Sequence, residues 1–211
     1  AGRLDGGEFG VGPPGDRSNV AIDLTHAGVA EVRRHVRMVP QNAADLLYLD
    51  TVAAECGTAD RAAGRPPGTC RAILETLAAG IPGDRNPRDL SEGQKLALVL
   101  AIQLTGDPGV VLLDEPTRGL DYPAKDALRA AVRRLAAAGS AVCIATHDVE
   151  FAAQVADRAV VVATGEVIAV GGSGEVLASS AIFSPQIARV LAPAEWLTVG
   201  QVTRALHAAG S

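Results

Sequence analysis

Two short apolar runs, separated by a helix-length segment, constrain the fold of this chain more than any other feature. The runs cover residues 110–113 and 141–145, and residues 123–138 between them are predicted to form a helix. Strands without polar alternation are typical of a parallel sheet that is buried on both faces. The sequence therefore predicts an α/β fold with a mostly parallel sheet.

The 211 residues are predicted to fall into four segments. These are remnants of core and edge strands at 1–40, a loop and helical sub-lobe at 41–104, the α/β core at 105–172, and a tail of one or two helices at 173–211. Within them we expect a strand that Pro40 stops before a loop at Gln41, helices at 45–56, 69–79 and 91–104, a strand pair at 159–163 and 166–170 around Thr164-Gly165, and a last helix that opens at Thr198 with Gln201.

Composition excludes several classes of protein. The formal charge of −5 is unlike the basic field of a nucleic-acid binder, so no nucleic-acid partner is expected. Cys56, Cys70 and Cys143 share no C-x-x-C spacing and are expected to be reduced thiols of a cytosolic protein. Because no run approaches the roughly 20 apolar residues of a membrane span, any membrane role is expected to come through a partner.

An acidic pair follows the first apolar run. Asp114 and Glu115 precede Pro116, at the carboxyl end of a predicted parallel strand, where ligands bind in open α/β sheets. Asp114 could hold Mg²⁺, directly or through water, and Glu115 could polarise an attacking water. The alternative is a strand that simply ends in a solvated acidic turn.

A histidine follows the second apolar run. Right-handed β-α-β connections place the carboxyl ends of successive parallel strands on one edge, so His147 is expected to face the same crevice as Glu115. An imidazole there could hydrogen-bond a γ-phosphate or the attacking water. Taken alone, a histidine at a strand end is more often structural or exposed.

A polar stretch opens the predicted helix at 91–104. Ser91 with Gln94 three residues later is a capping box, which explains these two residues structurally but leaves Gly93 unexplained. A capped helix start with a glycine that allows close approach is also a favourable anion site. The pattern thus fits both a structural cap and a phosphate contact.

These motifs together resemble the ABC-type nucleotide-binding domain, a P-loop NTPase. LSEGQ, VVLLDEP, Gly119-Leu120-Asp121 and ATHD occur in the order and approximate spacing of that family, and Val39-Pro40-Gln41 falls where the family has its glutamine loop. The resemblance implies ATP and Mg²⁺ as ligands, a transmembrane transporter subunit, and a second ATPase subunit in a homo- or heterodimer. It also implies a peripheral position on the inner face of the cell membrane.

The resemblance implies roles for individual residues. Gln41 would contact Mg²⁺ or water and sense the membrane partner. Ser91, Gly93 and Gln94 would complete the site of an opposing subunit, with Glu92 standing where the family usually has glycine, and Asp121 would lie at the dimer seam. Two stretches, LLYLDTVAAEC and FSPQIARVLAPAEWLTVGQV, resemble energy-coupling-factor or cobalt-type importer ATPases; ordinary amphipathic helices explain them equally well.

A phosphate-binding loop of the form G-x-x-x-x-G-K-[ST] is missing from the sequence. The nearest imitation, at residues 10–18, has two prolines that remove N–H donors and an Asp16 of the wrong charge. In the family this loop would lie before Ala1, so we expect the chain to be truncated at its N-terminus. We also expect the isolated chain neither to bind ATP tightly nor to hydrolyse it.

Three functions are consistent with these features. The favoured one is an ATP-hydrolysing subunit that powers import of a vitamin or metal ion. The second is a catalytically silent subunit that only lends its signature stretch to an intact partner. A DNA-repair or chromosome-type ATPase is disfavoured, because the segment between Gln41 and Leu90 is too short and too rich in Gly and Pro for a long coiled coil.

Overall fold

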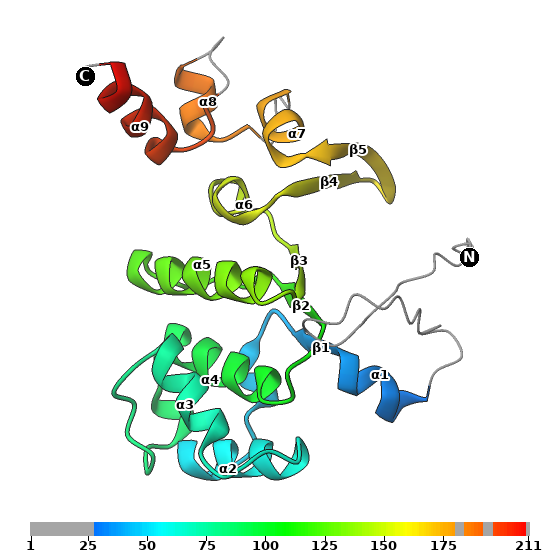
Figure 1. Ribbon diagram of the computed structural model, residues 1–211, viewed down its shortest axis with the longest axis vertical. Helices are drawn as coiled ribbons and strands as arrows, with labels where there is room; N and C mark the ends of the chain where they lie inside the picture. The colour runs from blue at the N-terminus through cyan, green and yellow to red at the C-terminus, as the bar shows by residue number, and fades with distance from the viewer. Residues whose placement is uncertain (1–27, 180–183, 192–195, 210–211) are drawn as a thin grey trace. The chain divides into compact units, whose positions relative to one another are not determined.

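The computed structural model describes residues 28–179, 184–191 and 196–209 (Figure 1). They form two compact units, one ending at Ala145 and the other beginning at Thr146. Residues 1–27 of the segment predicted to hold remnants of core and edge strands, including the imitation loop at 10–18, lie outside the described residues. In the described stretches no helix combines the length and the apolar character that crossing a membrane requires.

The first unit is built on a three-stranded parallel sheet in the order β1-β2-β3 (Figure 1). Its strands are β1 (Val36–Val39), β2 (Val110–Asp114) and β3 (Ala141–Ala145). Val39 is in register with Leu113, and Leu113 with Ile144. The predicted parallel sheet is therefore confirmed, and all three strands end at the same edge.

Burial of this sheet is one-sided within the described residues. Val111 and Leu113 are almost fully buried, as is Val39 beside them on β1. Met38 is 51% exposed and Cys143 is also exposed, and both are in register with Leu112 on the opposite face. The expectation that both faces are covered is thus not met by the part of the chain that the structure describes.

Two helices cover the buried face. Helix α4 (Glu92–Leu104) packs against β1, and helix α5 (Tyr122–Ala137), which connects β2 to β3, packs against β3. Both agree to within one residue with the helices predicted at 91–104 and 123–138. The apolar stretch of α4 from Leu96 to Ala101 is buried on all sides, because it is enclosed by the sheet and by other helices.

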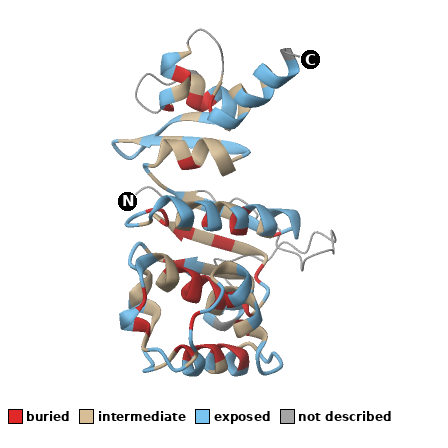
Figure 2. Ribbon diagram, turned by 90° about the vertical axis from the view of Figure 1, so that its left-hand side faces the viewer, coloured by how far each residue is buried: buried red, intermediate tan, exposed pale blue. Residues whose placement is uncertain are grey.

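A helical lobe precedes β2. It contains η1 (Ala43–Leu46), α2 (Val52–Ala62), α3 (Thr69–Leu77), η2 (Pro87–Asp89) and the start of α4. Figure 2 shows buried positions along the helices of this lobe. Their apolar side chains form one core, made of Val52, Cys56, Ala59, Cys70, Leu74, Ile81, Leu90, Ala97, Leu98 and Ala101.

Two predicted elements differ from the structure. Residues 45–51 do not form a continuous helix with 52–56, because the buried Glu55 carboxylate accepts hydrogen bonds from the backbone N–H groups of Tyr48 (2.5 Å) and Leu49 (2.7 Å). Thr51 then caps α2. The strand before Pro40 is only four residues long, because helix α1 (Val29–His35) precedes it.

The second unit contains a hairpin and four helices among its described residues. Strands β4 (Arg158–Ala163) and β5 (Glu166–Gly172) are antiparallel, and Thr164 and Gly165 have φ values of +52° and +82°, as a two-residue turn requires. Three helices follow rather than one or two. The cap predicted at Thr198 is present, since Thr198 and Gln201 each accept a hydrogen bond from the other's backbone N–H. The helices are α6 (Val149–Val155), α7 (Ser173–Ser179), α8 (Gln186–Val190) and α9 (Val199–Ala209).

Candidate functional site

The candidate site lies where the parallel strands end. Gln41 follows β1 by two residues and is exposed, and β2 ends in Asp114, which is in register with Ala145 of β3. The sheet therefore brings the glutamine and the acidic pair to one edge, where ligands bind in open α/β sheets. His147 follows Ala145 by two residues but belongs to the second unit, so its place beside Glu115 stays a prediction.

Glu115 has an unusual backbone conformation. Its φ is +45°, in the left-handed region, although proline follows it and favours an extended residue at this position. Its N–H donates a 2.8 Å hydrogen bond to the Ala145 carbonyl, and its own carbonyl accepts one of 3.1 Å from Arg118 N–H. The strand ladder thus continues through Glu115 before the chain turns sharply. Strained residues of this kind are common at functional sites.

Asp114 is half-buried and alternates with the buried Leu113, so it lies on the sheet face opposite to that residue. Its carboxylate and the amide oxygen of Gln41 are the hard oxygen donors that Mg²⁺ prefers. Across the described residues, no three His, Cys, Asp or Glu side chains gather as a metal cage. The donor set therefore fits an ion that keeps water or phosphate as most of its ligands, as Mg²⁺ does.

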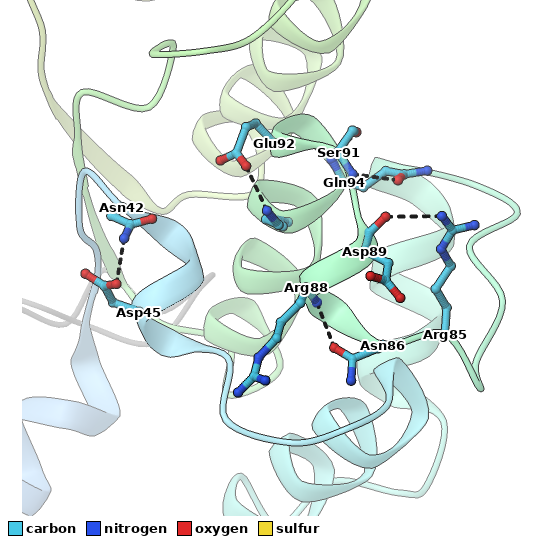
Figure 3. Close-up of polar contacts among 10 residues, drawn as sticks. Asn42, Asp45, Arg85, Asn86, Arg88, Asp89, Ser91, Glu92 and Gln94 are labelled. Carbon is cyan, nitrogen blue, oxygen red and sulfur yellow. Dashed lines mark hydrogen bonds and ion pairs between the residues drawn. The ribbon is translucent and has the colours of Figure 1, made fainter.

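The capping box at the start of α4 is present (Figure 3). Ser91 Oγ accepts a 3.3 Å hydrogen bond from Gln94 N–H, and Gln94 Oε1 accepts one of 3.1 Å from Ser91 N–H. Ser91 is exposed, and the capping bond uses its oxygen rather than its hydroxyl hydrogen. Ser91 can therefore cap the helix and still donate a hydrogen bond to an anion outside it.

Glu92, which stands at the unusual signature position, is paired within its own helix. Its carboxylate accepts a 2.8 Å hydrogen bond from Lys95 Nζ, and the two side chains form an ion pair (Figure 3). Its side-chain stem lies beside Gly119, which has a φ of +73° and where an added Cβ would be 3.7 Å from Glu92 Cγ. The lysine offsets the charge that Glu92 brings to this helix start, although exposed pairs of this type are weak.

Gly93 has a structural explanation that sequence reasoning missed. A Cβ added to it would stand 2.8 Å from the Cβ of Ala124 in the first turn of α5. Asp121 caps this helix, because its Oδ1 accepts a 2.9 Å hydrogen bond from Ala124 N–H. The starts of α4 and α5 therefore touch, and this contact brings Ser91 and Asp121 to neighbouring helix ends.

A mainly apolar cavity of about 150 Å³ lies between these two helices. Ser91, Gly93 and Gln94 line it together with Leu96, Leu100 and Leu128. Several alanines of α5 also line it, and their short side chains leave the space open. The polar signature residues thus stand at the border of an apolar interior.

The loop that leads into Ser91 is held by polar contacts that the motif search did not include (Figure 3). Asn86 Oδ1 accepts a 2.9 Å hydrogen bond from Arg88 N–H, and Arg85 Nη2 donates one of 3.1 Å to the Asp89 carbonyl. After Gln41, Asn42 Nδ2 donates a 2.6 Å bond to Asp45. The Asn86-Pro87 pair, an N-cap followed by proline at the first helical position, was the sequence signal for this frame.

The chain matches one protein-family model and several individual proteins of known sequence. Residues 17–153 match the family model described as "AAA domain, putative AbiEii toxin, Type IV TA system". A protein of Streptomyces coelicolor, named "Putative ABC transporter ATP-binding protein SCO2324", is 58% identical over 173 residues, which are 82% of this chain and 31% of that protein. The "Cobalt import ATP-binding protein CbiO" of Rhodobacter capsulatus is 37% identical over 71% of this chain and 55% of its own length.

A solved structure shows the same fold. It is that of cbiO1 from Clostridium perfringens, described as part of the ABC transporter complex cbiONQ, and it matches with a TM-score of 0.63 and 27% sequence identity. The match covers 77% of this chain and 66% of the clostridial one. This chain thus spans about a third of the Streptomyces relative and about half to two thirds of the others.

Proposed function

Because the chain belongs to the ABC transporter ATP-binding proteins, a family of P-loop NTPases, we propose that it supplies the signature half of a composite ATP site that powers import of a small solute. The contact between the starts of α4 and α5 is the observation that carries this proposal. It holds the exposed Ser91 and the cap residue Asp121 together on neighbouring helix ends. A helix start of this kind favours a bound phosphate.

The proposed roles follow the chemistry of each residue. Ser91 donates its hydroxyl hydrogen to a γ-phosphate of ATP bound by an opposing subunit, and Gly93 and Gln94 hold the helix start that presents it. Asp121 lies at the seam between the two subunits. Glu92, paired with Lys95, borders the same seam without adding a full negative charge.

The edge of the sheet is the second part of the proposed site. Asp114 and Gln41 would hold Mg²⁺, which offsets phosphate charge when bound. Glu115 orients and polarises the attacking water, and His147 hydrogen-bonds the γ-phosphate or that water. In this proposal residues 41–104 are the coupling and signature segment and residues 105–172 the catalytic segment.

The transported solute is proposed to be a metal ion or a vitamin, taken into the cell. Similarity to a protein named for cobalt import supports the direction of transport and a metal ion as cargo. A transmembrane subunit would bind the chain through the Gln41 segment and keep it at the inner face of the membrane. The clostridial structure, from a multi-subunit transporter, supports such a partner.

A second candidate function is a silent partner. The sequence contains no G-x-x-x-x-G-K-[ST] stretch, so these 211 residues supply a signature stretch but no phosphate-binding loop of this form. In a head-to-tail dimer, each site combines the phosphate loop of one subunit with the signature of the other. The chain would then activate an intact partner without hydrolysing ATP itself.

Both candidates are tested with one reconstitution. The partner is an intact ABC ATPase subunit that carries G-x-x-x-x-G-K-[ST] and whose own signature serine has been replaced by arginine. Addition of the purified chain is expected to restore ATP turnover, and the S91R chain to restore none. If the chain is a silent partner, it gives no turnover by itself.

Glu115 separates the two candidates. If the chain only lends its signature, the E115Q chain restores turnover as well as the wild type does. If the chain also hydrolyses ATP, the purified chain turns over alone and E115Q abolishes this activity. Circular dichroism checks that both proteins are folded. If they are and the wild-type chain does not stimulate the partner, the signature role is contradicted.

A further inference from the structure

The mainly apolar cavity of about 150 Å³ lies inside the first unit, where the end of α3 meets α4 and α5. Its walls are formed by residues of all three helices. Leu96 and Leu100 of α4 and Leu128 of α5 are buried and make up its interior, and Ser91 and Gln94 stand at its border. Most of the surface that an occupant would contact is therefore hydrocarbon.

Two contacts fix the spacing of the helices around this cavity. Gly93 and Ala124 already touch, because a Cβ on residue 93 would lie 2.8 Å from that of Ala124, so α4 and α5 cannot come closer there. Arg134 Nη2 donates a 3.3 Å hydrogen bond to the Thr76 carbonyl, which ties α5 to the last turn of α3. A cavity persists where its walls cannot collapse into it. These contacts therefore favour a lasting cavity over a gap that closes by repacking.

The chemistry of the lining selects the kind of molecule that fits. A water molecule in a cavity needs about two to four polar partners, and leucine side chains offer none. A charged group would lose its hydration against these walls without a compensating partner. Ser91 and Gln94, the polar residues of the lining, are already hydrogen-bonded to each other's backbone N–H groups. The cavity therefore favours an uncharged and mainly apolar occupant.

The volume of the cavity sets the size of that occupant. Leucine-lined protein cavities of about 150 Å³ stay free of water and bind benzene. The cavity between α3, α4 and α5 has this volume and a lining of the same kind. We propose that it is a binding site for one small uncharged molecule, with an aromatic ring or an aliphatic body of about the size of benzene. This site is separate from the phosphate contact proposed for Ser91.

An occupant of the cavity contacts three helices at once. Leu77 at the end of α3, Leu100 on α4 and Leu128 on α5 all line it. Because the occupant binds the folded chain alone, it strengthens the packing between the helical lobe and α5, and with it the helix start that carries Ser91. The inference does not rest on the proposed signature role, since it concerns only the binding of an apolar molecule and the stability of this packing.

The experiment uses the purified 211-residue chain, with fluorobenzene as the probe. Fluorine NMR of the probe is expected to show saturable binding with a dissociation constant of roughly 1 mM or below, as a ligand of this size allows. Excess benzene should displace the probe, because the two compete for one cavity. In carbon–proton spectra of the protein, the methyl signals of Leu96, Leu100 and Leu128 should shift on binding. Those of Leu206, which is exposed in the second unit, should not.

Two alanine-to-leucine variants of α5 control the experiment. Ala127 lines the cavity, whereas the exposed Ala130, three residues later on the same helix, does not. Both positions are exposed and leucine is a good helix former, so both variants should fold, as urea unfolding checks. The added side chain of A127L occupies the cavity and should weaken fluorobenzene binding by at least about tenfold, whereas A130L should stay within about twofold of the wild type. Saturating benzene should raise the Tm of A130L but not that of A127L.

Three results overturn the inference. The first is that the folded wild-type chain shows no saturable binding of fluorobenzene up to the solubility limit of the probe. The second is equal affinity of A127L and A130L for the probe, which would place the bound molecule away from the cavity. The third is binding that leaves the methyl signals of Leu96, Leu100 and Leu128 unchanged, which would show that the probe attaches to another part of the surface.

Discussion

Gly93 of α4 lies so close to Ala124 of α5 that a Cβ on residue 93 would stand 2.8 Å from the Ala124 Cβ. Real Cβ atoms essentially never approach so closely, so the contact exists only because residue 93 is glycine. The starts of two helices, each capped by a residue of the candidate site, are held together by this contact. Changes at either residue should therefore alter both the packing and the site.

G93A is expected to destabilise the chain by about 1–3 kcal/mol, because the added methyl group forces the helices apart. Urea unfolding monitored by circular dichroism measures the loss. The double variant G93A/A124G should recover at least about half of it, because the two residues are in contact. The matched control is G57A, within α2, whose Cβ would meet only the flexible end of Arg61 at 3.5 Å. This control should be unchanged or up to about 1 kcal/mol more stable. Equal losses at both glycines would contradict the packing argument.

Ser91 can be tested for its two roles separately. S91A removes the cap of α4 and should cost about 1 kcal/mol of unfolding free energy. S91D keeps an acceptor for Gln94 N–H and should stay within about 0.5 kcal/mol of the wild type. Because its carboxylate would repel a γ-phosphate, S91D should nevertheless fail to stimulate the partner ATPase. A stimulating S91D chain would leave Ser91 with a capping role only.

The sequence predicts this protein best where the signals are local. The structure confirms three features that follow from neighbouring residues. They are the bounds of β3, the capping boxes at Ser91 and Thr198, and the turn at Thr164-Gly165. The prediction of one continuous helix at residues 45–56 was wrong for residues 47–51, because the Glu55 carboxylate accepts hydrogen bonds from the backbone N–H groups of Tyr48 and Leu49.

Distant contacts explain what the sequence could not predict about the site. Gly93 owes its place to Ala124, a residue far along the chain, and no local pattern announces such a contact. The sequence also did not predict that the strand before Gln41 pairs with the strand of Asp114, because apolar runs indicate strands but not their order in the sheet. The meeting of His147 with Glu115 depends on how the two units come together and stays a prediction, as do the chemical roles of all these residues.

Substitution by glycine should affect the stability of the chain differently at Glu115 and at Asp114. Because Glu115 has a φ of +45°, E115G relieves backbone strain and should leave the chain as stable as the wild type or up to about 1 kcal/mol more stable. Asp114 is the last residue of β2, and its own φ is not positive. D114G should therefore lower the free energy of unfolding by about 0.5–1 kcal/mol. Thermal and urea unfolding measure both. Similar losses for the two variants would contradict the strain at Glu115.

Asp60 is expected to be among the most sensitive polar positions of the lobe. D60A leaves the buried N–H of Cys70 and that of Gly68 without their acceptor, and should cost about 2–4 kcal/mol. D60N keeps one acceptor oxygen and should lose roughly half as much. The exposed Asp84, changed to alanine, is the control and should stay within about 0.5 kcal/mol. Equal urea unfolding midpoints for D60A and D84A would show that the Asp60 carboxylate does not anchor α3.

The left-handed backbone at Glu115 has a consequence for judging proteins of this kind by their sequences. Ser91 and Asp121 each complete the first turn of a helix, so a descendant that no longer used nucleotides would still benefit from keeping them. Glu115 differs from them in its backbone, because glycine would adopt its left-handed conformation without strain. Under the proposed role of Glu115 in polarising water, its persistence would be a better sign of hydrolysis than the presence of the whole signature stretch.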